Sequence, residues 1–209
     1  MIGAFYQPRL VVADLDTLVT LPLREIRAGL AEVIKYGVIR DAAFFAWLEE
    51  NVERLLRLER EALAHAVATS CRIKAAVVEE DETEAGLRQI LNYGHTVGHA
   101  LEALTGYRVY HHGEAVAIGM AVAARLAVEL GLLAGEDAAR IVSLIRRAGL
   151  PTEVPEQFSP GELVRAMRLD KKTRGGRLTL VLPEVIGRVR IASGISEATV
   201  RRALQAFCH

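Results

Sequence analysis

The sequence predicts a mainly α-helical fold with one small β-hairpin near its C-terminus. Between Pro22 and Gly149, apolar residues recur at three- and four-residue spacing almost throughout, which is the helical period. Residues 177–182 and 187–191 instead alternate polar and apolar side chains around a turn, as hairpin strands do. Residues 9–14 form a short apolar run that ends in an acid and is typical of a buried strand. Because no partner strand follows it, we interpret it as the last strand of another domain.

The elements between these limits follow from turn residues. The helical region is predicted to begin at Leu21-Pro22, since proline suits a first helical turn. Five segments, each containing a glycine, are predicted to divide it into five or six helices: 37–41, 80–86, 106–113, 131–136 and 149–155. Residues 42–57 and 59–79 show long helical patterns. The apolar stretch 115–134 contains Arg125 and Glu129, so we expect a buried central helix and no membrane span.

The C-terminal part is predicted to be more mixed. A short helix is expected from Ser159-Pro160 to Met167, followed by a polar turn at residues 170–176 and the hairpin. Ser196 has the side chain and position of an N-cap for a final helix.

The composition excludes some classes of function. The 209 residues are 51% hydrophobic and contain 26 basic and 26 acidic side chains, so the net charge is zero. A general nucleic-acid-binding protein needs a basic face, which this balance disfavours, although a local basic pocket for a small anion stays possible. Cys71 and Cys208 are too few for a disulfide framework, and no signal peptide opens the chain. We therefore expect reduced thiols and a cytoplasmic location.

One stripe of polar side chains predicts a binding site. If residues 84–104 form one helix, a turn of about 100° per residue places six polar side chains on one face. These are Glu84, Arg88, Asn92, His95, His99 and Glu102. The apolar residues Leu87, Ile90, Val97, Leu101 and Leu104 fall on the other side. A solvated helix would carry Lys and Glu where this one carries two imidazoles and an amide, so the stripe predicts the wall of a metal site.

The ligand set has two arrangements on the sequence alone. His95 and His99 could bind one ion from adjacent turns, or His95 could bind with His112 while His99 contacts substrate or phosphate. Catalytic zinc takes three protein ligands, and Glu32 is a candidate for the third. By itself, Glu32 with Lys35 is more often a helix salt bridge. Lys171-Lys172 by itself is typical of a solvated turn.

The segments that carry these residues resemble 3-dehydroquinate synthase, in order along nearly the whole chain. The matching segments are Gly3-Ala-Phe-Tyr-Gln-Pro8, Thr20-Leu-Pro22, Ala31-Glu-Val-Ile-Lys-Tyr-Gly37, Ser70-Cys-Arg-Ile-Lys-Ala75, Glu84-Ala-Gly-Leu-Arg88, Leu91-Asn-Tyr-Gly-His-Thr-Val-Gly-His-Ala100, His112-Gly-Glu-Ala-Val-Ala-Ile-Gly-Met120 and Asp170-Lys-Lys172. The segment Ala31-Glu-Val-Ile-Lys-Tyr-Gly37 and the Asn-x-Gly-His-Thr-x-Gly-His motif that begins at Asn92 are together highly specific.

The resemblance implies an assignment for each site residue. Zinc, or Co²⁺, would be held by Glu32, His95 and His112. His99, Asn92 and one lysine of Lys171-Lys172 would lie near the substrate phosphate. The substrate hydroxyls and carboxylate would be held by Lys35, Lys74, Glu84 and Arg88. The nicotinamide cofactor would contact Thr17, Leu18, Val19 and Thr20.

The resemblance also implies the reaction and the domains. The family is a carbon–oxygen lyase of the shikimate pathway of aromatic amino acid biosynthesis. It converts 3-deoxy-D-arabino-heptulosonate 7-phosphate, a phosphorylated C7 sugar acid, to 3-dehydroquinate and phosphate while NAD⁺ is recycled. Residues 1–20 would be the end of an N-terminal Rossmann-like NAD-binding domain, and residues 21–209 the helical metal- and substrate-binding domain. The intact enzyme would be a homodimer without nucleic-acid or membrane partners.

One departure from the family limits these expectations. The sequence contains no Gly-x-Gly-x-x-Gly loop, so most of the NAD site would come from the N-terminal domain, in cis or in trans. We therefore expect this polypeptide alone to lack synthase activity. The alternatives are a related sugar-phosphate cyclase, a metal-dependent polyol dehydrogenase, or a non-catalytic metal-binding domain.

Overall fold

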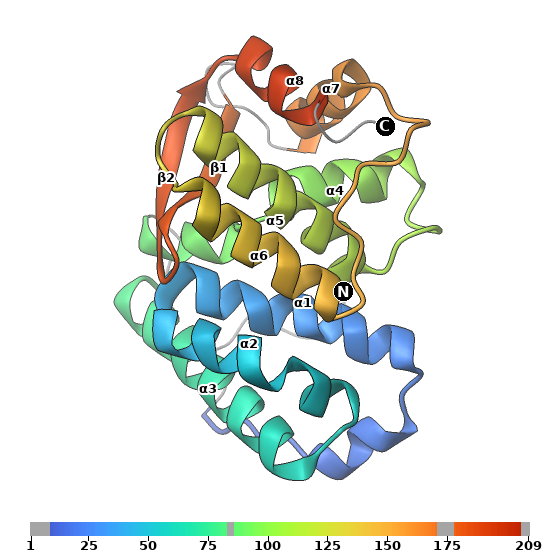
Figure 1. The fold of residues 1–209 in the computed structure, drawn as a ribbon, viewed down its shortest axis with the longest axis vertical. Helices are drawn as coiled ribbons and strands as arrows, with labels where there is room; N and C mark the ends of the chain where they lie inside the picture. Colours follow the sequence, from blue (N-terminus) through green and yellow to red (C-terminus); the bar gives the residue numbers. More distant parts are fainter. Residues whose placement is uncertain (1–8, 83–85, 171–177, 206–209) are drawn as a thin grey trace.

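Helices form most of the structure, a computed structural model that describes residues 9–82, 86–170 and 178–205. The helices are α1 (Leu23–Arg40), α2 (Ala42–Leu56), α3 (Arg60–Glu80), α4 (His95–Leu104), α5 (His112–Glu129), α6 (Gly135–Arg147), α7 (Pro160–Asp170) and α8 (Glu197–Gln205). In Figure 1, α1, α2, α3 and α6 lie on one side of the central helix α5, and α7 and α8 lie on the other. Two 3₁₀ helices, η1 (Leu15–Thr20) and η2 (Leu87–Asn92), and strands β1 (Leu178–Val185) and β2 (Arg188–Ile195) complete the described elements. The predicted fold class, mainly α with a small hairpin, is confirmed.

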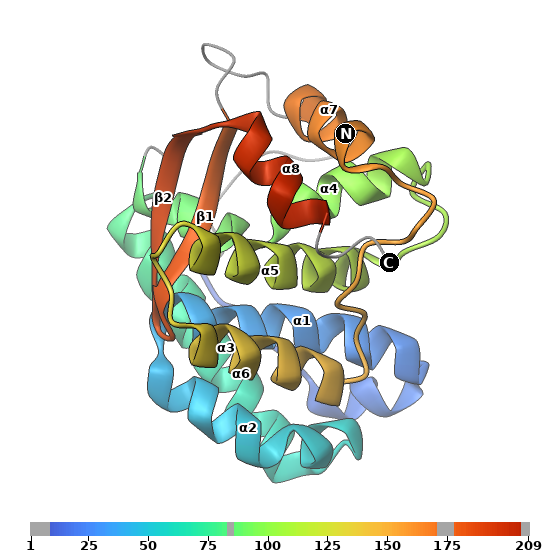
Figure 2. The ribbon, with the colours of Figure 1, turned by 45° about the horizontal axis from the view of Figure 1, so that its top comes forward.

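The central helix α5 is buried because its residues are small and apolar. It contacts α1, α4, α6, α8 and β1, and Figure 2 shows it running between α1 and α8. Two glycines let the neighbours approach its backbone. A Cβ on Gly113 would lie 1.9 Å from the Ala28 carbonyl oxygen, and one on Gly119 would lie 1.9 Å from the Gly94 carbonyl oxygen. The prediction of a buried helix across residues 115–134 is confirmed up to Glu129.

Among the described residues, no helix has the length and apolar character needed to cross a membrane.

The helix boundaries are set by capping side chains. Asp41 begins α2 by accepting a hydrogen bond from the Phe44 amide at 2.8 Å. Ser159 caps α7, and Ser196 caps α8 as the sequence predicts. The predicted break at residues 37–41 is wrong except at Asp41, because α1 continues through Gly37. There a Cβ would lie 3.0 Å from the Phe45 Cα, so Gly37 allows α1 and α2 to pack closely.

The hairpin forms where the alternation predicts it and is longer than expected. β1 and β2 pair antiparallel, with Leu180 opposite Ala192. Pro183, which we expected in the loop, lies in β1 beside an irregularity in the register between Pro183 and Val185. Such an irregularity accommodates a residue that has no amide hydrogen. The turn is held against the helices, since the Gly187 amide donates to the Val38 carbonyl at 2.9 Å.

The prediction of one helix over residues 84–104 is wrong. The 3₁₀ helix η2 ends at Asn92, and α4 begins at His95 after Gly94, whose φ is 81°. A Cβ at Gly94 would lie 2.6 Å from the Met120 Cγ and 2.7 Å from the Val116 carbonyl oxygen. The chain therefore turns here because only glycine fits this backbone conformation against α5.

The buried strand predicted at residues 9–14 is also not observed. These residues do not form a strand, and Leu10, Val11 and Val12 are exposed. The physical reason is that no strand lies beside them in the described part of the chain, so their backbone groups have no ladder to join.

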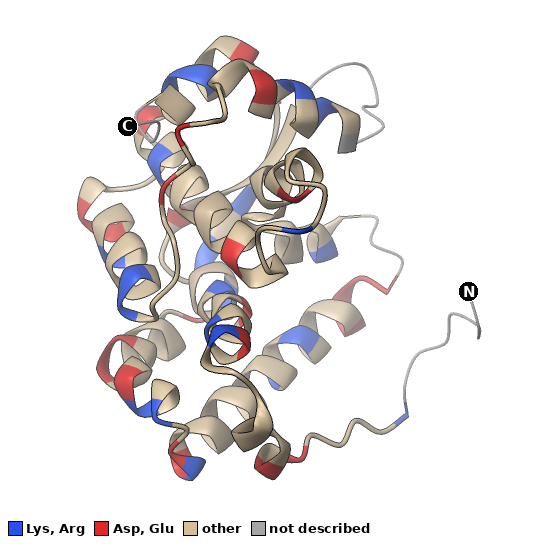
Figure 3. Ribbon diagram, turned by 90° about the vertical axis from the view of Figure 1, so that its right-hand side faces the viewer, with Lys and Arg blue, Asp and Glu red and all other residues tan. Residues whose placement is uncertain are grey.

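Charged side chains of both signs are interspersed over the helices (Figure 3). Two ion pairs connect α2 to α6. Arg140 donates to Glu49 at 2.7 Å and Arg147 donates to Glu53 at 2.8 Å. These groups are partly exposed, so the pairs orient the helices and contribute little to stability.

Candidate metal centre

Glu32 and Lys35 form a pair on one face of α1. The Lys35 ammonium donates to the Glu32 Oε2 atom at 2.5 Å. Burial lowers the pKa of Lys35, although the Glu32 carboxylate acts to raise it. Burial alone would raise the pKa of Glu32, but the nearby Lys35 charge and hydrogen bond outweigh it and lower that pKa. The lowered pKa favours the ionised form of Glu32, and because Lys35 binds Oε2, the other carboxylate oxygen is left to act as a metal ligand.

That second oxygen, Oε1, is buried and accepts no hydrogen bond from the described residues. Such an atom is costly unless a cation or a donor satisfies it. Two imidazole nitrogens face it. The His95 Nε2 atom lies 3.6 Å away and the His112 Nε2 atom lies 4.0 Å away.

His95 is oriented by the turn that precedes α4. Its Nδ1 atom lies 3.1 Å from the Tyr93 carbonyl oxygen, so a hydrogen on Nδ1 would leave the Nε2 lone pair facing Glu32. The Tyr93 hydroxyl in turn donates to the Met120 carbonyl at 3.0 Å, which attaches the turn to α5. Burial, assisted by the charge of Lys35, lowers the pKa of His95 to about 4. The ring is therefore neutral at neutral pH, which is the form that binds metal.

His112 reaches the same point from the first residue of α5. Gly113 lets this end of α5 lie against the Ala28 backbone of α1, one helical turn before Glu32. Arg24 holds Glu114 through two hydrogen bonds of 2.7 Å, and Glu114 accepts from the His111 amide at 2.9 Å. The His112 ring is about half exposed, and its Nδ1 atom faces Glu102. Three helices thus bring the three groups together.

The donor set fits a divalent metal ion of the zinc type. Glu32, His95 and His112 each offer one ligand atom, and the three atoms lie within 4.8 Å of one another. One carboxylate and two imidazoles, with one buried oxygen unsatisfied, match the three-ligand pattern of catalytic zinc sites. Of the two arrangements open on the sequence, the geometry favours His95 with His112.

His99 lies beside this set. Its ring centroid is 5.5 Å from that of His95 and 5.9 Å from that of His112. It belongs to a second close group with Glu102 and His112.

The other predicted site residues are spread around the centre. Lys74 is exposed on α3, and its charge contributes to the low pKa of Lys35. Arg88 donates to the Glu82 carbonyl at 2.8 Å, and its amide is held by Asp81. Glu84, Lys171 and Lys172 lie outside the described residues.

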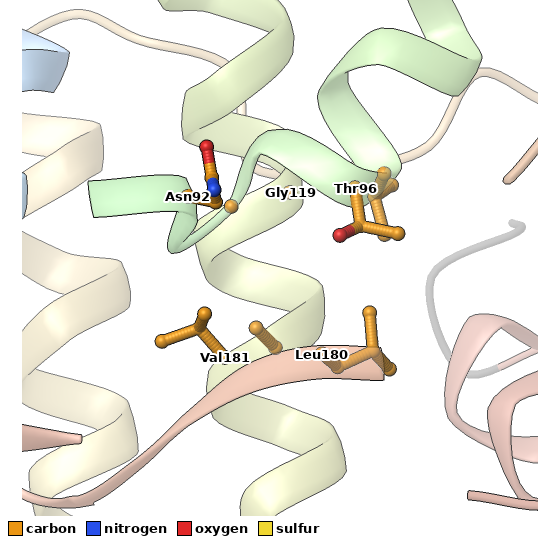
Figure 4. Close-up of a pocket in the computed structure, with 8 residues that line it drawn as sticks. Asn92, Thr96, Gly119, Leu180 and Val181 are labelled. Carbon is orange, nitrogen blue, oxygen red and sulfur yellow. The ribbon is translucent and has the colours of Figure 1, made fainter. Parts of the chain in front are cut away.

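Asn92 lines a small gap between η2, α5 and β1 together with Thr96, Leu180 and Val181. In Figure 4 the Asn92 side chain points away from the two strand residues. The gap has a volume of about 10 Å³, which is about the space of one water molecule. It is therefore too small for a sugar phosphate.

The predicted cofactor contacts, Thr17, Leu18, Val19 and Thr20, lie in η1, which contacts α3. The structure thus does not bring them into the histidine cluster. Three further residues support the centre but were not predicted from the sequence: Arg24, Tyr93 and Glu114. Glu114 is an acid at the third position of α5, which is a capping signal. Tyr93 directly precedes Gly94, the glycine of the turn before α4.

Comparison with known proteins decides the family. The sequence model described as "3-dehydroquinate synthase C-terminal" matches residues 29–173, more than half of the chain. The chain belongs to this family. A 3-dehydroquinate synthase from Pelotomaculum thermopropionicum is 62% identical over 197 residues, covering 94% of the chain and 53% of the relative. A 3-dehydroquinate synthase from Desulforamulus reducens is 55% identical over 204 residues, which cover 98% of the chain and 57% of that relative. The chain thus spans about half the length of these relatives.

Solved structures of this synthase-like fold agree with the architecture. A 2-epi-5-epi-valiolone synthase from Streptomyces hygroscopicus subsp. jinggangensis, with NAD⁺ and Zn²⁺ bound, superposes with a TM-score of 0.84 at 27% identity. The match covers 93% of this chain and 54% of the valiolone synthase chain. A 2-deoxy-scyllo-inosose synthase complexed with carbaglucose-6-phosphate, NAD⁺ and Co²⁺ has a TM-score of 0.80 at 24% identity. The match covers 99% of this chain and 58% of that synthase, and at this identity it shows the fold alone.

Proposed function

We propose that this chain is the metal- and substrate-binding part of a 3-dehydroquinate synthase. The reaction is the conversion of 3-deoxy-D-arabino-heptulosonate 7-phosphate to 3-dehydroquinate and phosphate. The observation that carries the proposal is the convergence of Glu32, His95 and His112 around one unsatisfied carboxylate oxygen. Identities of 55–62% to proteins with that name, against 24–27% to other cyclases, favour this reaction within the family.

The domain division and cofactors belong to the same proposal. Residues 21–209 form the helical domain, and residues 1–20 belong to the end of an NAD-binding domain. The centre takes Zn²⁺ or Co²⁺, in keeping with the 2-epi-5-epi-valiolone synthase and 2-deoxy-scyllo-inosose synthase structures, which each hold NAD⁺ together with one of these ions. A metal ion held by these residues would acidify a substrate hydroxyl, and NAD⁺ would take the hydride from the carbon that bears this hydroxyl.

The chain's own residues position the substrate. Lys35 is buried and already paired with Glu32, so it keeps the carboxylate ionised and offers further donors to a hydroxyl beside it. Lys74 on α3 and Arg88, the second residue of η2, supply positive charge for the substrate carboxylate. A guanidinium can bind such a carboxylate through two parallel hydrogen bonds. His99, whose ring lies 5.5 Å from that of His95 and 5.9 Å from that of His112, contacts the substrate beside the metal. Asn92, Glu84, Lys171 and Lys172 are assigned by resemblance to the same substrate, and residues 17–20 to the nicotinamide.

A related cyclase is the second candidate, since the structural neighbours are cyclases that make other products. Both candidates are tested by supplying the polypeptide with the NAD-binding portion of the P. thermopropionicum relative. With Zn²⁺, NAD⁺ and the C7 substrate, we expect phosphate release and a product with the mass of 3-dehydroquinate. Turnover of a different sugar phosphate, offered in a parallel assay, with none of the C7 substrate would indicate the related cyclase. Stoichiometric metal binding without any turnover would indicate a non-catalytic metal-binding domain.

Variants of the ligands test the centre within that assay. Glu32→Ala and His112→Ala should abolish tight zinc binding, because each removes one of three ligands. His99→Ala should keep the zinc and lose turnover. The assignment would be wrong if elemental analysis found that His99→Ala loses the metal while His112→Ala keeps it.

A further inference from the structure

Glu102 is a buried carboxylate that the proposed ligand set does not use. It lies on α4, one turn beyond His99, with 8% of its surface exposed. Its two oxygens lie 3.3 Å and 3.4 Å from the His112 Nδ1 atom. Among the described residues, His112 is its sole ion-pair partner. Burying an acid is expensive, so this placement needs a compensating interaction, and the imidazole of His112 is the group that supplies it.

His112 needs such a partner more than His95 does. Its side chain is 48% exposed and it stands at the first residue of α5, so packing does not fix the ring. The two ring nitrogens have different surroundings. Nδ1 faces the Glu102 carboxylate, while Nε2 faces the unsatisfied Oε1 atom of Glu32. A hydrogen donated from Nδ1 to Glu102 leaves the lone pair on Nε2, the nitrogen directed at the centre.

The geometry points to Glu102 as the positioning residue of the metal centre, which fixes the tautomer and orientation of His112 so that Nε2 binds the ion. The inference rests on the proposed ligand role of His112. The ligating histidines then differ in support, because the Nδ1 atom of His95 faces a neutral carbonyl and that of His112 a carboxylate. A carboxylate partner makes the imidazole the more basic ligand, and loss of such a partner typically costs about 10- to 100-fold in metal affinity.

Glu102, His99 and His112 could instead be read as a second cation site, since their ligand atoms also lie close together. Two observations favour positioning. Both oxygens of Glu102 already face the His112 ring, whereas Glu32 has the oxygen that lacks a partner.

The experiment measures zinc affinity and stoichiometry of the 209-residue chain by competition with a chromophoric chelator. Glu102→Ala should weaken zinc binding about 10- to 100-fold while one ion still binds. Glu102→Gln should weaken it less, because an amide oxygen still accepts from Nδ1. Glu129→Ala removes a partly exposed glutamate near the far end of α5 that pairs with Arg125, and should leave affinity unchanged. Circular dichroism and melting of the zinc-free variants check that each one folds.

The outcomes separate this inference from the proposed function. If the unaltered chain binds no zinc, or His112→Ala binds it as well, the ligand assignment itself fails. If those controls behave as expected and Glu102→Ala stays within about twofold of the unaltered chain, only the positioning role is contradicted. Two ions per chain, falling to one in Glu102→Ala, would make Glu102 a ligand and also contradict it. Cobalt-loaded Glu102→Gln should keep the visible absorption bands of the unaltered chain, since its ligands are the same.

Discussion

Gly113 sets the distance between the helices that carry Glu32 and His112. The nearest atoms to a Cβ at this position would be the backbone oxygen, carbon and Cα of Ala28, at 1.9, 2.5 and 2.7 Å. Backbone cannot yield as a flexible side chain can, so Gly113→Ala should push α1 and α5 apart. We expect a loss of about 1–3 kcal/mol in the free energy of unfolding, together with weaker zinc binding.

Urea unfolding measures this prediction, with Gly135→Ala as the control. A Cβ on Gly135, at the start of α6, would meet no atom within 4 Å. Equal stability of the two variants would mean that the close contact at Gly113 does not determine the spacing.

The buried neutral ring of His95 predicts how stability depends on pH. In zinc-free protein its pKa is about 4, against 6.5 for the free side chain. Between these values the unfolded chain binds more protons, so the free energy of unfolding should fall as the pH falls from 6.5 toward 4. A difference of about 2.5 pKa units limits the contribution of this group to about 3 kcal/mol. Denaturant titrations of the unaltered chain and of His95→Gln, with a chelator present, measure it; parallel pH profiles would contradict it.

At the scale of elements, the start of α5 is held by one arginine. Arg24 on α1 donates to both oxygens of Glu114 and to the Val109 carbonyl. Its side chain is half exposed, so Arg24→Ala should change the global free energy of unfolding only slightly. It should, however, speed amide hydrogen exchange in residues 109–114 and shorten zinc residence.

Arg140→Ala is the matched control, because Arg140 makes a similar two-pronged pair with Glu49 at the α2–α6 contact. Exchange in residues 109–114 should be unchanged in that variant. If both variants loosen this segment equally, the effect is general and Arg24 has no special role.

The sequence predicts those elements whose signals are local. Ser159, Ser196 and Asp41 stand at helix starts, and the alternation of residues 177–182 is visible in the sequence without any partner strand. The turn at Gly94 is different, because it depends on contact with Val116 and Met120 of α5, more than twenty residues away. The same holds for Gly37, which a local reading takes as a break although it allows close helix packing. The apolar run at 9–14 has a strand's pattern but no described strand to pair with.

The candidate site was predictable in its chemistry but less so in its geometry. The residue types Glu32, His95 and His112 are those of a metal centre, yet nothing local decides between His99 and His112. The decision comes from Gly113, which brings the start of α5 against α1. Glu102 is on the predicted polar stripe, but its role depends on the ring across from it.

At the scale of the whole molecule, the proposed metal connects distant parts of the sequence. Its ligands come from α1, α4 and α5, and α5 packs against both of the other two. Zinc at about 100 times its dissociation constant should therefore stabilise the fold by about 2.7 kcal/mol. This corresponds to a rise in Tm of about 5–10 °C for a chain of this size.

Thermal melts with zinc and with chelator measure that rise. His99→Ala should retain it and His112→Ala should lose it. An equal rise in both variants would show that zinc stabilises the protein from some other place.

The most direct test of the central claim is anomalous X-ray diffraction at the zinc edge from crystals of the zinc-loaded chain. The account predicts one strong peak, about 2.0–2.2 Å from a Glu32 oxygen and from the Nε2 atoms of His95 and His112. A peak between His99 and Glu102 instead, or no peak near Glu32, would contradict it.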